Sequence, residues 1–266
     1  MGFEIKTGTV KTERYKIEYF SFGKGERPFV IIPGMWMRSM IPSAKEIAAD
    51  YSAFGEKYKV YFIERKNEME YGYMVPDMAE DTADVMKRFG LHDVYLFGIS
   101  QGGAIAQLVA ARYPELVSKL VLGSTNMRPN ATTEAVFSRW MSLARIGNTA
   151  ELNRDAFSKI YSNEYYEKYR EEFEFLEKQG TAEELKRFSV LAKACLMFDS
   201  TEETKKIKCP TLVIGAGNDR IMTAEASREI AGAIGCELYV YEGASHAVYD
   251  EAEDYKARVL EFLERH

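Results

Sequence analysis

The stretch Gly98-Ile99-Ser100-Gln101-Gly102 is the part of this sequence whose residue types and spacing best suit covalent chemistry. Strand-forming residues precede this G-x-S-x-G motif at 94–97, and a helical pattern of small and aliphatic residues follows it. In that setting the glycines allow a strained turn that presents the Ser100 hydroxyl, and the helix N-terminus offers N–H groups to an oxyanion. The pentapeptide alone is also consistent with a glycine-rich surface turn, so a nucleophilic Ser100 requires a base and an acid elsewhere.

The chain has three histidines that could serve as the base. His266 is the last residue, where chains usually fray, and His92 precedes the 94–97 strand, at the opposite end from Ser100. His246 directly follows a strand predicted at 237–241, so in a parallel sheet it lies on the same edge as Ser100. Because a serine hydroxyl needs a base that works near neutral pH, as imidazole does, we predict His246 as that base.

Asp219 is the predicted acid, because it follows the strand at 211–215 and so reaches the same sheet edge. A carboxylate there can hold the imidazole tautomer and stabilise the imidazolium. The alternative for Asp219 is a turn-forming or helix-capping role. Its rivals are Asp199, which lies in a helical region, and Asp250, which is expected to start the last helix.

Apolar runs of strand length alternate with helical patterns through most of the chain. The runs lie at 29–32, 60–63, 94–97, 120–123, 210–215 and 237–241, and the helical patterns at 43–54, 76–89, 101–113, 223–234 and 249–264. Continuous apolar strands joined by helical crossovers predict an α/β fold, a mostly parallel, doubly wound sheet with helices on both faces. Alternating segments at 3–10 and 14–22 predict an additional hairpin.

Residues 127–206 interrupt this alternation with helical patterns only, at 131–146, 149–161, 163–178 and 181–197. The segment is rich in aromatic residues, including Trp140. It is either a plain helical insertion with its own core or a cap whose inner face covers an apolar pocket. We favour a helical cap at 127–206, inserted into a core domain of residues 1–126 and 207–266.

With Ser100, Asp219 and His246 in this order, the chain resembles the α/β-hydrolase fold superfamily over nearly its whole length. It is especially similar to the capped esterase and enol-lactonase-like group at 77–91, 97–125 and 210–219. The resemblance implies a helical lid after the sixth strand, which 127–206 matches. It also implies an oxyanion hole built from the backbone N–H groups of Gln101 and Met35.

Two segments depart from the family pattern. The H-G pair that ends the third strand in the family is replaced by Pro33-Gly34, followed by Met35. The glycine-rich D-x-R-G-x-G-x-S-like loop after the fourth strand is replaced by Glu64-Arg65-Lys66-Asn67-Glu68, in which Glu64 and Arg65 are expected to keep a structural ion pair. Both changes are expected to reshape the mouth of the pocket while leaving the three reactive groups in place.

Bulk properties exclude several classes of function. The net charge of −6 argues against a nucleic-acid groove or an anionic membrane surface as partner. No C-x-x-C pair occurs, so neither a disulfide framework nor a metal site is indicated, and no cofactor is expected. The N-terminus lacks an apolar signal segment, and no run approaches 18 apolar residues. We therefore expect a cytoplasmic protein, a monomer or homodimer, whose partner is a small-molecule acyl substrate.

These observations predict a cofactor-free serine hydrolase of a small or medium apolar ester, thioester or lactone, with an acyl-enzyme on Ser100. Gly34, Trp36 and Trp140 are expected to contact the substrate. Acyl transfer, perhydrolysis and C–C bond hydrolysis would use the same groups. A ligand receptor on a hydrolase scaffold is the alternative from another class.

Overall fold

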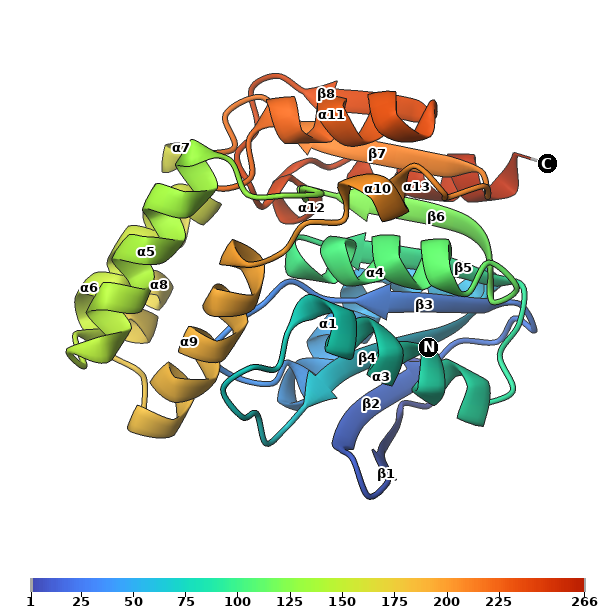
Figure 1. Cartoon of the computed structure of the whole chain (residues 1–266), viewed down its shortest axis with the longest axis horizontal. Helices are drawn as coiled ribbons and strands as arrows, with labels where there is room; N and C mark the ends of the chain where they lie inside the picture. Colours follow the sequence, from blue (N-terminus) through green and yellow to red (C-terminus); the bar gives the residue numbers. More distant parts are fainter. Residues whose placement is uncertain (1, 266) are drawn as a thin grey trace.

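In the computed structural model, which describes residues 2–265, eight strands form one sheet (Figure 1). They span Lys6–Lys11 (β1), Lys16–Phe22 (β2), Pro28–Ile32 (β3), Lys59–Lys66 (β4), Val94–Ile99 (β5), Val117–Gly123 (β6), Thr211–Ala216 (β7) and Glu237–Tyr241 (β8). Their order is β1-β2-β4-β3-β5-β6-β7-β8. β2 pairs antiparallel with β1 and β4, and the other neighbours are parallel. The predicted α/β fold, mostly parallel with an N-terminal hairpin, is confirmed.

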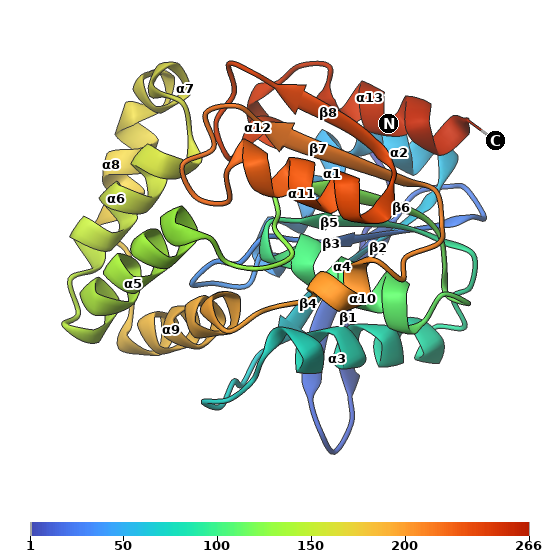
Figure 2. The ribbon, with the colours of Figure 1, turned by 45° about the horizontal axis from the view of Figure 1, so that its top comes forward.

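Helices cover both faces of this sheet (Figures 1 and 2). On one face the core includes residues of α3 (Val75–Arg88), α4 (Gln101–Arg112) and α11 (Ala224–Ile234). On the other face it includes residues of α1 (Ala44–Asp50), α2 (Ser52–Lys57) and α13 (Tyr255–Glu264). A 3-10 turn, η1 (Ile41–Ser43), leads into α1.

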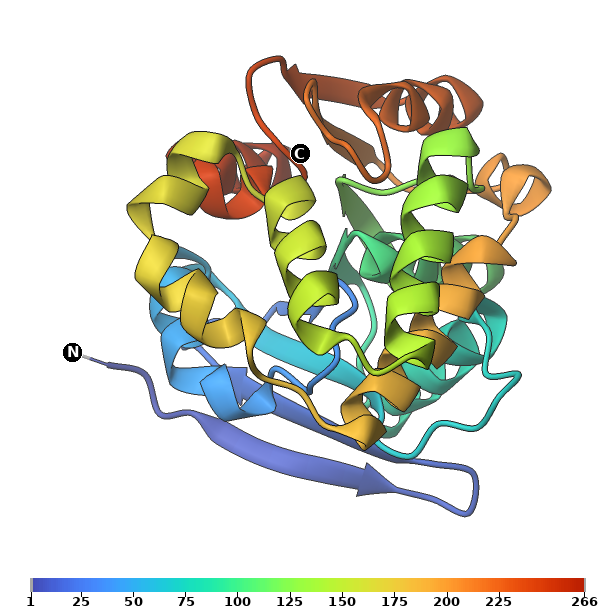
Figure 3. The same cartoon turned by 90° about the vertical axis from the view of Figure 1, so that its left-hand side faces the viewer.

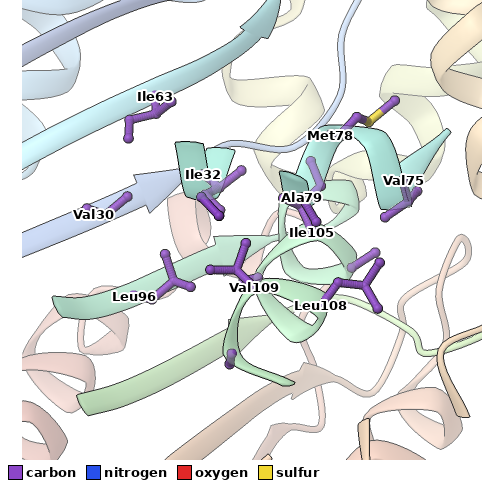
Figure 4. Close-up of a cluster of buried hydrophobic side chains, with 14 of the residues drawn as sticks. Val30, Ile32, Ile63, Val75, Met78, Ala79, Leu96, Ile105, Leu108 and Val109 are labelled. Carbon is purple, nitrogen blue, oxygen red and sulfur yellow. The ribbon is translucent and has the colours of Figure 1, made fainter. Parts of the chain in front are cut away.

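β3 shows why the central strands read as continuous apolar runs. Val30 and Ile32 are buried in the core against α4, where Figure 4 shows them on the same side of the sheet as Val109. Phe29 and Ile31 are buried in the opposite core. Since successive side chains of a strand point to opposite faces, a strand covered on both sides must be apolar at every position. The resulting close-packed centre fixes the carboxyl ends of the strands, where the candidate site lies.

Two of the predicted helices that pack near the sheet are each broken in the structure. The helix expected at 43–54 divides at Tyr51, whose backbone (φ −96°, ψ 22°) leaves helical geometry. The helix expected at 249–264 becomes α12 (Val248–Glu251) and α13, separated by the extended Ala252. Tyr51 and Tyr255 at these breaks are both buried. Apolar spacing alone does not mark the breaks, because the buried positions continue on either side of them.

Between β6 and β7 the chain forms a helical insertion, defined here as residues 131–196, which lies beyond one end of the sheet (Figures 1 and 3). Its helices are α5 (Ala131–Arg145), α6 (Thr149–Ile160), α7 (Asn163–Lys168), α8 (Arg170–Glu177) and α9 (Ala182–Leu196). α7 and α8 replace the single helix predicted at 163–178, because Tyr169 (φ −115°, ψ 31°) interrupts it. The short α10 (Thr201–Thr204) falls within 127–206 but contacts α4 and α11 of the core.

The helical insertion has an apolar core of its own. Phe137, Trp140 and Phe188 are buried together, and Met37 and Met222 from loops at the sheet edge join the same cluster. Side-chain caps fix the helix starts, such as the Asn130 oxygen that accepts from the Thr133 N–H at 2.9 Å. The insertion is therefore a packed layer held directly over the loops that follow the strands.

Candidate active site

Ser100 lies at the turn between β5 and α4, in a strained backbone conformation (φ 53°, ψ −122°). A Cβ at Gly98 would come within 2.4 Å of the Gly102 carbonyl oxygen, and one at Gly102 within 2.1 Å of the Ile32 oxygen. Both glycines are required by this close approach rather than by a surface turn. A non-glycine residue in this region costs about 1–3 kcal/mol, and the surrounding hydrogen bonds, such as Thr125 Oγ1 to the Ser100 carbonyl oxygen at 2.7 Å, hold it there.

The structure brings Ser100, His246 and Asp219 together in one hydrogen-bonded series. Ser100 Oγ lies 3.1 Å from His246 Nε2, and His246 Nδ1 lies 2.9 Å from Asp219 Oδ2. All three side chains are buried. His246 follows the adjacent β8 and Asp219 follows β7, while Ser100 follows β5 on the far side of β6, so the ends of three parallel strands position the groups at one edge of the sheet. This is the arrangement that a nucleophile, a base and an orienting acid require.

The Asp219 carboxylate is held as an anion. Its second oxygen, Oδ1, accepts hydrogen bonds from the N–H groups of Ile221 at 2.8 Å and Met222 at 3.0 Å. Burial alone would raise the pKa of this carboxyl, but the charge and hydrogen bond of His246 and these two amides outweigh burial and lower its pKa. An ionised Asp219 accepts a hydrogen bond from the Nδ1–H group of His246 and so leaves Nε2 free to accept a hydrogen bond from the Ser100 hydroxyl.

The segment Pro33-Gly34-Met35 lies beside the nucleophile. A Cβ on Gly34 would be 3.4 Å from Ser100 Cβ and 3.9 Å from Ser100 Oγ. Within residues 2–265, the backbone N–H groups of Met35 and Gln101 donate to no protein acceptor. Two free amides next to a serine hydroxyl can stabilise negative charge on a tetrahedral oxygen.

Arg65, at the end of β4, connects these two segments. Its guanidinium donates to the carbonyl oxygens of Pro33 at 2.5 Å and Gly34 at 3.3 Å, and to Gln101 Oε1 at 3.1 Å. The Gln101 side chain in turn donates to the Leu191 carbonyl oxygen in α9 at 2.8 Å. Arg65 therefore fixes the loop that carries the Met35 amide against the residue that carries the other amide.

The charge of Arg65 is compensated locally. The side chain is 3% exposed, and burial lowers the pKa of the guanidinium while the nearby Glu64 carboxylate raises it. Glu64 lies 3.7 Å from Arg65 and 2.8 Å from Arg187 of α9, so the expected ion pair is present and extends to the insertion. The sequence predicted the Glu64–Arg65 ion pair but not the hydrogen bonds from Arg65 to the Pro33 and Gly34 carbonyl oxygens. No local pattern shows which backbone oxygens a distant arginine reaches.

A cavity of about 340 Å³ adjoins the nucleophile. Its lining includes Ile99 directly before Ser100, and also Gly34 and Trp36, two residues expected to contact the substrate, but not Ser100 or His246 themselves. Trp36 stacks on Phe157 of α6, with ring centroids 5.4 Å apart. The walls are mainly apolar and aromatic, and come both from the sheet edge and from α6 and α8 of the helical insertion.

Trp140 requires a correction, because it does not belong to this lining. Its ring lies in the core of the insertion, edge-on to Phe137 at 5.2 Å, and its indole N–H donates to Asp155 Oδ2 at 2.7 Å. A buried indole needs a partner for its N–H, and Asp155 supplies it inside the helical layer. The aromatic content of the segment could not distinguish such a core residue from a cavity residue.

The remaining candidates lie elsewhere. His92 is exposed just before β5, far along the strand from Ser100, and exposed Asp199 accepts from the Thr201 N–H at 2.9 Å. Asp250 lines the cavity from α12, whereas the ring nitrogens of His246 are bonded to Asp219 and Ser100. His266 lies outside the described residues. In residues 2–265 no group of three or more His, Cys, Asp or Glu side chains could hold a metal ion, and no helix is long and apolar enough to cross a membrane.

The sheet order, the strained serine turn after β5 and the helices inserted after β6 define an α/β-hydrolase. Residues 63–253 match the family model described as serine aminopeptidase, S33. Because this match covers most of the chain, the protein belongs to that family of hydrolases.

Individual relatives are distant. The chain is 27% identical over 230 residues to a Rhizobium rhizogenes protein named as a carbamate hydrolase, RutD, covering 81% of this chain and 86% of that one. A solved α/β-hydrolase from a Medee basin deep-sea metagenome library superposes with a TM-score of 0.87 at 21% identity, covering 97% and 98% of the two chains. An enol-lactonase from Burkholderia xenovorans gives 0.84 at 18% identity, covering 97% and 100%. At such identities the structural likeness concerns the fold alone.

Proposed function

We propose that this hydrolase cleaves carboxylic ester-type bonds through an acyl-enzyme on Ser100. The observation that carries the proposal is the buried hydrogen-bonded series from Ser100 through His246 to an ionised Asp219. A binding protein would not need all three groups in this order, whereas acyl transfer does.

In the first half-reaction, Ser100 Oγ attacks the acyl carbon while His246 Nε2 accepts its proton. The tetrahedral oxygen accepts hydrogen bonds from the Met35 and Gln101 amides, each worth about 3–4 kcal/mol by comparison with other oxyanion holes. Collapse breaks the bond to the leaving group, which takes the proton from His246. Water then attacks the acyl carbon with His246 as base, releasing the carboxylic acid and restoring Ser100.

The cavity supports a small or medium substrate with a largely apolar body, as an ester, thioester or lactone. Its volume of about 340 Å³ and its aromatic walls fit such a group, and the helical insertion acts as a cap that keeps water away from it. The names of two relatives, a carbamate hydrolase and an enol-lactonase, both describe cleavage at an acyl carbon, which agrees with this class.

A fluorophosphonate probe tests the nucleophile without knowledge of the substrate. We expect stoichiometric labelling of Ser100 by intact mass and peptide mapping, and no labelling of the Ser100→Ala variant. Ser118, whose exposed hydroxyl donates to the Asp93 carbonyl oxygen at 2.8 Å, offers a matched control: Ser118→Ala should label like the native chain. A folded native protein that resists the probe would rule out an activated Ser100.

A further inference from the structure

We propose that Arg65 strengthens the oxyanion hole electrostatically, and that Arg187 of the helical insertion controls this effect by holding the Glu64 carboxylate away from Arg65. Arg65 polarises the peptide group that carries the Met35 N–H, which makes this N–H a better donor to the tetrahedral oxygen. The inference rests on the proposed function and deepens it, because it gives a residue of the insertion a part in the chemical step. Neither arginine lines the cavity, so both act as positioning residues.

The hydrogen bonds that the Arg65 guanidinium makes within residues 2–265 all go to neutral oxygens. It donates to the carbonyl oxygens of Pro33 and Gly34 and to Gln101 Oε1. In the same part of the chain, Glu64 is the only carboxylate within 4.0 Å, and its distance of 3.7 Å is too long for a hydrogen bond. Because the guanidinium is also buried, its charge acts on these neutral groups with little screening by water.

The contact with Gly34 connects this charge to the oxyanion hole. The Gly34 carbonyl oxygen, which accepts from Arg65 at 3.3 Å, belongs to the same planar peptide group as the Met35 N–H. A cation at the carbonyl oxygen polarises the peptide group and makes its N–H a stronger donor. The benefit is largest when the acceptor is a negative oxygen, as in the transition state, so it raises kcat more than it lowers KM.

Glu64 is the group that would cancel this polarisation if it bonded to Arg65. Its side chain is only 2% exposed, so its charge must be satisfied by the protein. Arg187 Nη2 donates to Glu64 Oε2 at 2.8 Å, and Arg187 Nη1 donates to the Lys66 carbonyl oxygen at 3.2 Å. The hydrogen bond to the carboxylate therefore comes from α9 of the insertion and not from Arg65.

Two guanidinium groups share this one carboxylate, so a single positive charge remains behind the oxyanion hole. Burial lowers the pKa of the Arg65 guanidinium, Glu64 raises it and Arg187 lowers it again, which shows that Glu64 and Arg187 act on Arg65 in opposite senses. Without Arg187, the buried Glu64 has Arg65 as its nearest cation. Arg65 would then turn toward Glu64 and weaken its contact with Gly34.

Steady-state hydrolysis of 4-nitrophenyl heptanoate by two variants tests the proposal, with rates referred to active Ser100 by fluorophosphonate titration. We expect Arg187→Gln to lower kcat by about tenfold with a smaller change in KM, because a donor to the oxyanion is weakened but not removed. Adding Glu64→Gln should return kcat to within about threefold of the native value, since no carboxylate then competes for Arg65.

The matched control is Arg154→Gln, which also deprives a buried carboxylate of its arginine. Arg154 donates to Glu177 at 3.1 Å, and the Glu177 side chain is 5% exposed. Both residues lie in the insertion and neither lines the cavity. This variant should therefore lose stability as Arg187→Gln does, but keep the native kcat.

Hexyl trifluoromethyl ketone gives a second measure, because Ser100 Oγ adds to its carbonyl carbon, His246 takes the hydroxyl proton and the carbonyl oxygen becomes the oxyanion. Its Ki should rise in Arg187→Gln by the factor by which kcat falls, and recover in the double variant. An unchanged kcat and Ki in Arg187→Gln, or no recovery in the double variant, would overturn the inference while a native chain that hydrolyses the ester and labels at Ser100 upholds the proposed function. A native chain that does neither refutes both.

Discussion

The two ends of the cavity differ in how their polar groups are satisfied. At the Ser100 end, His246, Asp219 and Arg65 are buried and bonded to protein partners at 2.5–3.3 Å. At the other end, the exposed Asp250 lines the cavity with Tyr51, Tyr161 and Tyr249, and its carboxylate has no ion-pair partner within residues 2–265. The reacting groups are thus organised before any ligand arrives, as efficient catalysis requires, whereas the exposed Asp250 carboxylate is held by no ion pair.

The largest loss of activity should come from a substitution of Asp219, at the Ser100 end of the cavity. Asp219→Asn keeps the shape of the side chain, but its amide favours the wrong imidazole tautomer, in which Nε2 carries the proton. We expect kcat to fall by about 10⁴-fold, by analogy with other serine hydrolases, with little change in KM. Steady-state kinetics on 4-nitrophenyl heptanoate measure this change, and a loss below tenfold would assign Asp219 a merely structural role.

A substitution of Arg65 tests whether residues 33–35, which carry the Met35 amide, must be held in place for catalysis. Arg65→Lys keeps the positive charge near Glu64 but cannot donate to Pro33, Gly34 and Gln101 together. We expect a decrease of about 10²-fold in kcat, a smaller change in KM and slower fluorophosphonate labelling. Arg88→Lys, on the exposed side of α3, is the matched control. Equal losses in kcat and in folded protein, with labelling of the folded fraction unchanged, would contradict a positioning role.

The Asp250 carboxylate, which has no ion-pair partner, should lower the stability of the folded protein in a pH-dependent way. The folded-state pKa of Asp250 is raised, so its ionised form is disfavoured by folding. This penalty is absent below the ordinary aspartate pKa of about 3.9, grows as the pH rises and is complete above about 7. Asp250→Asn should therefore raise the melting temperature by a few degrees at pH 8 relative to the native chain, and by less at pH 5. Scanning calorimetry at both values checks the sign.

A substitution of Trp140 should have the smallest effect on catalysis. It tests whether this ring belongs to the core of the insertion rather than to the cavity. Trp140→Phe removes the hydrogen bond to Asp155 and some buried surface, and should cost about 1–3 kcal/mol of folding stability. KM for 4-nitrophenyl heptanoate should stay within about twofold, because the ring does not line the cavity. A selective increase in KM would show that Trp140 contacts the substrate.

The sequence permitted prediction of the parallel sheet and of the Ser100–His246–Asp219 series, because both depend on local patterns and on strand ends that share an edge. Gly34 and Trp36 could be placed for the same reason, since they directly follow β3. The Arg65 contacts and the position of Trp140 could not, since both depend on how the insertion and distant loops pack in three dimensions. Asp250 was considered only as a rival to Asp219, because nothing in its neighbours along the chain indicates a cavity wall.

The hydrogen bond from the Gln101 side chain to Leu191 has a consequence for how a ligand gains access. Because Gln101 begins α4 directly behind the nucleophile, any outward swing of α9 would pull on the same residue whose amide faces the tetrahedral oxygen. The Glu64–Arg187 pair ties α9 down at a second point. The other half of the layer is tied down as well, because the Ala247 N–H next to His246 donates to the Ile160 carbonyl oxygen of α6 at 2.8 Å and the Ser162 N–H donates to Glu251 Oε1 at 2.8 Å. Movement of either half of the insertion would therefore strain a residue that adjoins one of the reacting groups.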